Sequence, residues 1–262
     1  MRALRVFSFG LLVGWRDLAV FWNWKTWTLG WILRVCAVAG SWILLGKLLQ
    51  SEELIEFLLI GNAIAAGASA AAWAIPASTW DRVDGTYPLL LISPGSIFPA
   101  IVGRTAVWMV NGVLTSVVAF CVLSFAFDYS IEHASYWEVG LTIITVCTST
   151  YCFAVFLGAW ITLLPKLRNV ALGLVATAIT TVCGVSVPIS FWPSPVQVVA
   201  FALPVTNGLE GFRALVSNDM GNQFAILLTN EIVVGAGWFL LGVLLMDVIA
   251  NRGRRDGSVE FM

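Results

Sequence analysis

Long apolar runs dominate this sequence, and each is about as long as a helix must be to cross a lipid bilayer. At 1.5 Å per residue, about 20 apolar residues span a hydrocarbon core of ~30 Å. Hydrophobic residues make up 59% of the chain and charged residues 11%, whereas a soluble domain has about 25% charged residues. We therefore expect an all-α, polytopic membrane protein that forms one domain over residues 1–262. Six transmembrane helices are expected, at residues 27–49, 54–75, 97–127, 138–164, 169–187 and 224–250.

Residues 1–26 show the pattern of an amphipathic helix at a membrane surface. Arg2, Arg5 and Arg16 share one stripe, and apolar residues such as Phe7 and Trp22 lie on the opposing side. A basic amphipathic helix that contains tryptophans belongs in the headgroup plane. We favour this interfacial helix over a ragged start to the first span, because the basic residues oppose deep burial.

The basic residues also predict an orientation. With a cytoplasmic amino terminus, most Lys and Arg residues fall on inner segments, Lys47 and Arg213 fall outside, and Arg34 lies within a span. Cytoplasmic loops of membrane proteins are enriched in Lys and Arg. We therefore expect a protein of the cytoplasmic membrane with both termini in the cytoplasm. The net charge of −1 gives no reason to expect nucleic acid as a partner.

Four polar side chains are expected within the spans, namely Arg34, Asn111, Glu231 and Asp247. An ionisable residue at membrane depth is a candidate for function, because placing its charge in lipid is costly. Arg34 and Asp247 lie at matching depths near inner helix ends, so we expect either a structural contact between them or an Arg34 side chain that extends to the interface. Glu231 is expected nearer the outer face, and Asn111 is expected to form a hydrogen bond between helices.

The sequence offers little for catalysis or metal binding. His133 is the only histidine, and the five cysteines lie in apolar runs without a Cys-x-x-Cys pair. A phosphate-binding loop of the form GxxxxGK[ST] is also absent from the sequence. We therefore expect no metal, no cofactor and no ATP hydrolysis on this chain.

A polar stretch from Trp80 to Arg104 interrupts the apolar runs after the second expected span. Asp81, Arg82 and Asp84 open this stretch and are too costly to place in lipid. Leucine-rich sequence follows, and Pro94 can end a helix. The pattern predicts a short amphipathic helix lying across a membrane face within residues 79–94. An ordinary solvated loop fits the same residues about equally well.

The same stretch resembles the cytoplasmic coupling-helix region of ABC-2 type transporter permeases. That family has an acidic-Arg-x-acidic-Gly-Thr sequence, matched by Asp81–Thr86, and a later Ser-Pro pair, matched by Ser93-Pro94. Gly103-Arg104 matches the start of the following helix. The chain departs from the family pattern at Tyr87, where Leu is usual, and at Pro88, where an acid is usual.

A second similarity to this family lies between the last two expected spans. Residues 188–218 are apolar but broken by four prolines, so they predict two short helices that dip into the outer leaflet and return. The family pattern is matched by Trp192-Pro193, Leu203-Pro204-Val205-Thr206 and Glu210-Gly211-Phe212-Arg213. The resemblance implies an outer gate here, formed by Trp192, Pro193, Pro204, Thr206, Glu210 and Arg213.

The resemblance implies the permease subunit of an ATP-driven exporter. Two permease chains, identical or different, would assemble in membrane lipid with two ABC nucleotide-binding (ATPase) subunits, which carry the ATP and Mg²⁺. Asp81, Arg82 and Asp84 would face a cleft of the ATPase. The full set of implied coupling residues is Asp81, Arg82, Asp84, Gly85, Thr86, Tyr87 and Pro94. The few charges at membrane depth favour a hydrophobic or amphipathic substrate, such as a drug, an antibiotic or a lipid-like molecule.

Other functions remain open at this point. Export of a lipid-linked polysaccharide is the second interpretation, because that branch of the family shares the architecture, and Trp15-Arg16-Asp17 resembles its amino-terminal pattern. A receptor or structural subunit that does not transport is an alternative from another class. An intramembrane enzyme is a further alternative, although Arg34, Glu231 and Asp247 form no catalytic constellation that we recognise.

Overall fold

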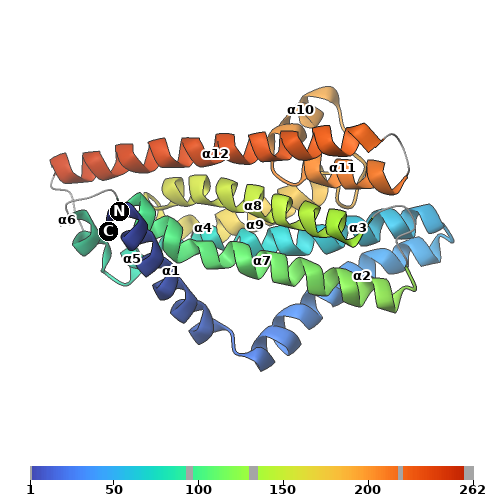
Figure 1. Cartoon of the computed structure of the whole chain (residues 1–262), viewed down its shortest axis with the longest axis horizontal. Coiled ribbons are helices and arrows are strands. Elements are labelled where there is room, and N and C mark those ends of the chain that lie inside the picture. The colour runs from blue at the N-terminus through green and yellow to red at the C-terminus, as the bar shows by residue number, and fades with distance from the viewer. Residues whose placement is uncertain (1, 93–96, 130–134, 218–220, 257–262) are drawn as a thin grey trace.

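The structure is a computed structural model that describes residues 2–92, 97–129, 135–217 and 221–256. Within these residues the chain is helical and contains no strand, which confirms the prediction of an all-α protein. Five of the described helices are long and apolar enough to cross a membrane, so the chain has the character of a multi-pass membrane protein. They cover Thr26–Leu48, Glu52–Val83, Phe98–Ala126, Tyr136–Ile161 and Gln223–Arg252. α3, α7, α8 and α12 run along the long axis of the molecule, and the helix that leads into α2 is inclined to it (Figure 1).

The elements follow one another with short connections. The amino-terminal half contains α1 (Arg2–Phe21), the π-helix η1 (Thr26–Ile32), α2 (Leu33–Leu48), α3 (Glu52–Ala71), α4 (Ala74–Ala77), α5 (Trp80–Val83), α6 (Tyr87–Ile92) and α7 (Phe98–Ala126). The rest contains α8 (Tyr136–Ile161), η2 (Pro165–Leu167), α9 (Arg168–Val182), η3 (Ile189–Phe191), α10 (Ser194–Ala202), α11 (Thr206–Val216) and α12 (Gly221–Asp256). The start of α1, α5, α6 and the end of α12 lie at one end of the molecule, and α10 and α11 lie towards the other (Figure 1).

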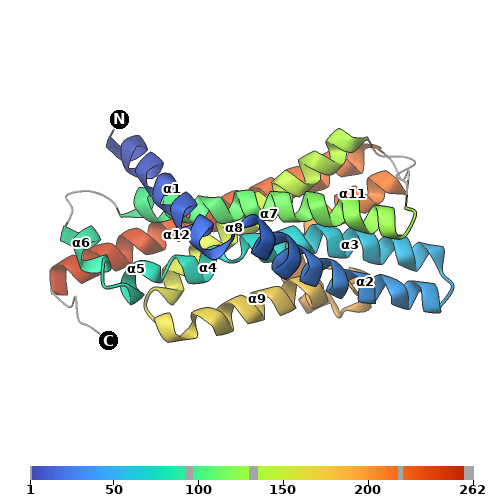
Figure 2. The ribbon, with the colours of Figure 1, turned by 90° about the horizontal axis from the view of Figure 1, so that it is seen from below.

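α1 is a separate helix and not the start of the first span. Asn23 and Thr26 cap the next helix reciprocally: the Thr26 N–H donates to Asn23 Oδ1 over 2.9 Å, and the Asn23 N–H donates to Thr26 Oγ1 over 3.0 Å. Gly10 and Gly14 allow α1 to cross α7 closely, because a Cβ at Gly14 would lie 2.0 Å from the carbonyl oxygen of Arg104. α1 is inclined to the bundle axis in both views (Figure 1 and Figure 2). The predicted amino-terminal helix is therefore a distinct element that packs on α7.

The glycines of the second apolar run bring α3 close to its neighbours. A Cβ at Gly67 would lie 2.6 Å from the carbonyl oxygen of Gly112 on α7. A Cβ at Gly61 would lie 2.4 Å from the carbonyl oxygen of Val185, in the segment after α9. Only glycine fits at these contacts, so α3 packs at the centre of the bundle.

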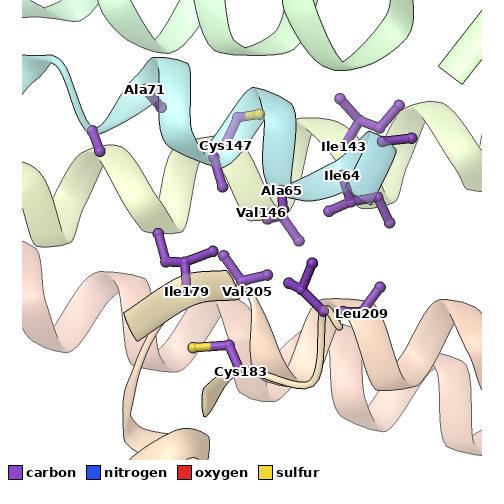
Figure 3. Packing of buried hydrophobic residues seen from close by; sticks show 14 of the residues in the cluster. Ile64, Ala65, Ala71, Ile143, Val146, Cys147, Ile179, Cys183, Val205 and Leu209 are labelled. Atoms are coloured by element: carbon purple, nitrogen blue, oxygen red, sulfur yellow. The ribbon is translucent and has the colours of Figure 1, made fainter. Parts of the chain in front are cut away.

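Buried apolar side chains of four helices meet around α3. Ile64 comes from α3, Ile143 and Val146 come from α8, and Leu209 comes from α11, each no more than 2% exposed. Ile179 of α9 completes this part of the core (Figure 3). The hairpin that contains α11 is therefore part of the folded core and not a loose surface loop.

The fifth predicted span differs most from the structure. α9 has 15 residues, which extend about 22 Å at 1.5 Å per residue and fall short of a ~30 Å hydrocarbon core. Gly184 then takes a φ of +82°, a conformation that favours glycine. Pro188 lacks a backbone N–H and cannot continue a helix. The apolar run over 169–187 is thus part helix and part irregular backbone.

Candidate coupling site and outer hairpin

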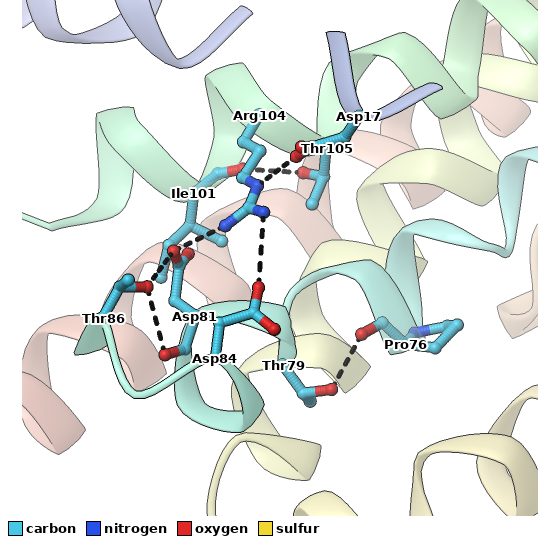
Figure 4. Close-up of polar contacts among 9 residues, drawn as sticks. All are labelled: Asp17, Pro76, Thr79, Asp81, Asp84, Thr86, Ile101, Arg104 and Thr105. Atoms are coloured by element: carbon cyan, nitrogen blue, oxygen red, sulfur yellow. Dashed lines mark hydrogen bonds and ion pairs between the residues drawn. The ribbon is translucent and has the colours of Figure 1, made fainter. Parts of the chain in front are cut away.

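Arg104 of α7 is surrounded by three carboxylates at the end of the bundle that carries α5. Its Nε donates to Asp17 Oδ2 of α1 over 2.6 Å, and a terminal nitrogen donates to Asp81 Oδ1 of α5 over 2.5 Å. Asp84 Oδ2 lies 4.0 Å from the other terminal nitrogen (Figure 4). The side chains of Arg104 and Asp81 are each only 14% exposed. A guanidinium that binds carboxylates from two other helices fixes both helices against α7.

An aromatic cluster continues from this network into the bundle. Phe21 stacks on Trp80 with 5.0 Å between ring centroids, and Trp80 meets Trp108 edge to face at 6.2 Å. Trp108 stacks on Trp73 at 5.6 Å, and Trp73 meets Trp31 edge to face at 6.3 Å. Aromatic pairs in such geometries contribute about 0.5–1.5 kcal/mol each beyond area burial. The rings therefore form a packed connection from α1 and α5 through α7 to η1.

The predicted coupling segment forms two short helices and not one. A turn at Gly85 separates α5 from α6, and its φ of +70° explains the break, because glycine adopts this conformation at little cost. Thr86 closes the turn: its hydroxyl donates to Asp81 Oδ1 over 3.0 Å. Tyr87 begins α6 and is buried. Pro94 lies outside the described residues.

The prediction that Asp81, Arg82 and Asp84 all face an ATPase cleft needs correction. Asp81 is turned into the protein by Arg104 and Thr86, so its carboxylate is not a free surface group. Asp84 is 59% exposed and remains accessible. Sequence pattern could not separate the two acids, because their orientation depends on Arg104, which lies on a different helix.

Arg82 belongs to a basic surface beside this network. Its guanidinium lies 4.5 Å from the ring centroid of Tyr87. Arg82, Lys166 and Arg168 line one cavity of about 380 Å³, whose described lining contains no acid. Arg82 forms no ion pair within the described part of the chain. The surface therefore offers unneutralised positive charge at the end of the bundle that carries α5.

Glu231 of α12 holds the start of α11, a role that the sequence did not reveal. Its side chain is fully buried, and its carboxylate accepts the backbone N–H groups of Val205 over 2.8 Å and Gly208 over 3.1 Å. These groups lie at the first turn of α11, where a helix leaves N–H groups without partners. The carboxylate therefore caps α11 from another helix and meets the positive end of its dipole. Val205 has a φ of +86°, which is strained for a β-branched residue and needs such support.

Arg213 ties α11 to α3 and to the segment after α9. Its terminal nitrogens donate to the carbonyl oxygens of Gly184 over 2.7 Å, Phe57 over 3.0 Å and Val185 over 3.4 Å. Glu210 Oε1 lies 3.3 Å away, and the guanidinium lies 3.6 Å from the Phe57 ring centroid. These contacts join α11 to α3 and to the segment after α9.

The predicted outer-gate residues divide between two turns and α11. Trp192 and Pro193 precede α10, Pro204 lies in the turn before α11, and Thr206, Glu210 and Arg213 belong to α11. Trp192 Nε1 donates to the carbonyl oxygen of Thr181 over 3.2 Å, which fastens the first turn to α9. The prolines thus set the turns, whereas Arg213 and Glu231 hold α11 in place.

Two of the four polar residues expected in the spans have a clear outcome. Asn111 accepts a hydrogen bond from Trp27 Nε1 over 2.9 Å, which confirms the predicted bond between helices. Arg34 forms no hydrogen bond or ion pair with any described residue, Asp247 included. α2 and α12 lie on opposite sides of the bundle (Figure 1). The predicted contact between Arg34 and Asp247 is therefore wrong.

Comparisons of the chain with protein-family models, with curated proteins and with solved structures found no match. The family resemblance of the coupling segment and of the outer hairpin therefore stays a prediction from sequence. The contacts of Arg104, Glu231 and Arg213 are the basis on which a function is proposed.

Proposed function

We propose that this chain is the permease subunit of an ATP-driven ABC exporter and that a separate ATPase chain powers it. The observation that best supports this is the Arg104 network, which joins the coupling-like helix α5 to α1 and α7. A motor that moves α5 would also move α1 and α7, because the ion pairs and the aromatic cluster hold the three helices in direct contact. Packed elements with two discrete arrangements are how such local movements become large ones.

The proposed topology has six crossings, with both termini in the cytoplasm and the hairpin over 188–218 re-entrant from outside. α9 and the irregular backbone after it would make the short crossing. Irregular backbone at membrane depth is stable only where its polar groups are satisfied, and Arg213 donates to the carbonyl oxygens of Gly184 and Val185 there. The apolar part of α7 after Arg104 is long enough for a ~30 Å core, so the Arg104 network would lie at the inner face.

The ATPase would dock on the surface formed by α5 and the turn after α8. Arg82, Lys166 and Arg168 give this surface positive charge that no described residue neutralises, so an acidic partner surface fits it. A second permease chain would complete the pathway, and the substrate would be hydrophobic or amphipathic. The chain itself would carry out no chemistry, and ATP and Mg²⁺ would bind to the partner.

Affinity purification of the tagged chain from its native membranes tests this proposal. We expect a phosphate-loop ATPase in the purified complex, and Arg82→Glu should abolish its retention, because the reversed charge repels the acidic partner surface. Glu53→Arg is the matched control: it reverses an exposed charge in the first turn of α3 and should leave retention unchanged. Recovery of the chain without such an ATPase, or equal retention by both variants, would contradict the proposal.

A further inference from the structure

Arg34 is a charged residue at membrane depth that the described part of the chain leaves without a partner. Trp31, one turn before it, donates to the Thr115 hydroxyl over 3.2 Å, and Thr115 lies near the middle of α7. Lys47, at the far end of α2, lies 5.3 Å from the ring centroid of Phe127, just beyond α7. Arg34 therefore lies at the depth of the middle of α7, with its side chain exposed on the surface of the bundle. The sequence had suggested a position near the inner end of the span. A charge at this depth is costly unless water, an anion or another chain accompanies it.

Two cavities meet at Arg34. One has a volume of about 730 Å³ and lies among the rings of Phe21, Trp22, Trp73 and Trp108. The other has a volume of about 410 Å³ and lies between α2, α3 and α9. Arg34, Trp31 and Trp73 line both cavities, so the two form one groove. The described lining contains Lys25 and Arg34 but no acid.

The walls of this groove include a π-helix and two glycines that leave open space beside them. η1, which forms one wall, is a π-helix, a rare geometry that is frequent at functional sites. A Cβ at Gly30 on η1 or at Gly173 on α9 would meet no atom within 4 Å. These two glycines therefore serve no close packing within the described chain, although both line the groove.

We propose that the groove binds an amphiphile whose head group is negatively charged. The Arg34 guanidinium offers a planar fork of donors that matches carboxylate and phosphate oxygens. The tryptophans offer apolar walls for the hydrocarbon chain of the amphiphile. Lys25, which also lines the larger cavity, attracts the same negative charge. The bound molecule is a substrate only if the proposed function holds, whereas the binding site itself does not depend on it.

Quenching of tryptophan fluorescence by brominated lipid tests this site without any ATPase. The full chain is placed in nanodiscs and titrated with phosphatidylglycerol or with phosphatidylcholine that carries the same dibrominated chains. We expect the anionic lipid to quench with about tenfold higher apparent affinity, the effect of one charge-assisted hydrogen bond. Trp31→Phe should reduce this preferential quenching, because Trp31 lines both cavities.

Two pairs of variants test the charge of Arg34 and the open space of the groove separately. Arg34→Gln should abolish the preference for the anionic lipid, and Arg34→Lys should keep part of it. Gly173→Leu should weaken quenching by filling the groove, while Gly237→Leu is its matched control, because a Cβ at Gly237 on α12 also meets no atom within 4 Å. Gly173→Leu leaves Arg34 in place, so it keeps the test valid even if the Arg34 variants fail to fold.

The outcomes distinguish this inference from the proposed function. An equal response to both lipids, or a preference that survives in Arg34→Gln and Gly173→Leu, would overturn the site. Chemical cross-linking of two copies that is lost in Arg34→Gln, without a lipid preference, would assign the groove to a second chain and also overturn it. If the lipid preference holds but no ATPase binds the chain, the proposed exporter function is contradicted and the proposed binding site is supported. If an ATPase binds and the preference is absent, the site alone fails.

Discussion

Two arginines of nearly equal burial hold the opposite ends of this bundle through different kinds of partner. Arg104 is 14% exposed and Arg213 is 13% exposed, and every ion pair found among the described residues involves one of them. Arg104 binds side-chain carboxylates from α1 and α5, whereas Arg213 binds mainly backbone carbonyl oxygens. Carboxylate side chains can change partner while their helices stay folded, but backbone carbonyls cannot. The end that carries Arg104 is therefore suited to transmit movement, and the end that carries Arg213 is suited to hold its shape.

The largest expected effect comes from replacing Arg213. Arg213→Gln removes the charged donor to the carbonyl oxygens of Gly184 and Phe57 and the ion pair with Glu210. We expect it to destabilise the fold by about 3–5 kcal/mol. Thermal unfolding of the purified chain in detergent measures this loss. Arg213→Lys should recover only part of it, because one ammonium cannot reach carbonyls on both sides. A change of less than about 1 kcal/mol in Arg213→Gln would remove the contrast between the two ends.

The cap on α11 gives the next largest effect. Glu231→Ala leaves the N–H groups of Val205 and Gly208 buried without an acceptor, at a cost of about 2–3 kcal/mol. Glu231→Gln keeps one acceptor oxygen and should lose about half as much. Limited proteolysis should show faster cleavage at the turn before α11 in Glu231→Ala than in the unaltered chain. If both variants were as stable as the unaltered chain, α11 would not depend on this cap.

Much of this fold follows from the sequence, and what does not follow depends on contacts between distant residues. Long apolar runs predict helices because a backbone in lipid must satisfy its own hydrogen bonds. The length of α9 was wrong because the apolar run continues past Gly184 while the helix does not. Hydrophobicity reports the environment of a residue and not its backbone conformation.

The candidate site shows the same limit more sharply. The pattern Asp81-Arg82-x-Asp84 marks a polar segment outside the apolar layer, but it cannot tell which acid faces inward. Asp81 faces inward because Arg104 lies on the next long helix, at a distance set by packing. Glu231 likewise looked like a lone acid in an apolar run, and only the fold shows that it caps α11.

Replacing Arg104 should affect the proposed transmission of movement more than the stability of the fold. Arg104→Gln removes the ion pairs with Asp17 and Asp81, and we expect a loss of about 1–2 kcal/mol, since the freed carboxylates lie near the end of the bundle. Stimulation of a bound ATPase by the chain should nevertheless be lost, because α5 is no longer joined to α1 and α7. Combining Arg104→Gln with Asp17→Asn in a double-mutant cycle should show a coupling of about 0.5–3 kcal/mol. Full stimulation in Arg104→Gln would show that movement takes another route.

The smallest expected effect concerns the two acids, Asp81 and Asp84, within the Arg104 network. Asp81→Asn and Asp84→Asn remove the same charge from the same segment, but their positions differ. Asp81 is mostly buried and accepts hydrogen bonds from Arg104 and Thr86, so its amide variant should cost about 1–2 kcal/mol. Asp84 is 59% exposed and lies 4.0 Å from Arg104, so its amide variant should change stability by no more than about 0.5 kcal/mol.

The two variants can be compared by thermal unfolding at low and at high salt. Added salt screens exposed pairs more than buried ones, so any contribution of Asp84 should vanish while that of Asp81 persists. Equal losses for both variants would mean that Arg104 holds the two acids alike, and the turn at Gly85 would then be fixed by both of them. An effect confined to Asp81 would leave Asp84 available to bind a partner chain. The proposed function requires both, because the segment must be held to α7 and also bind the partner.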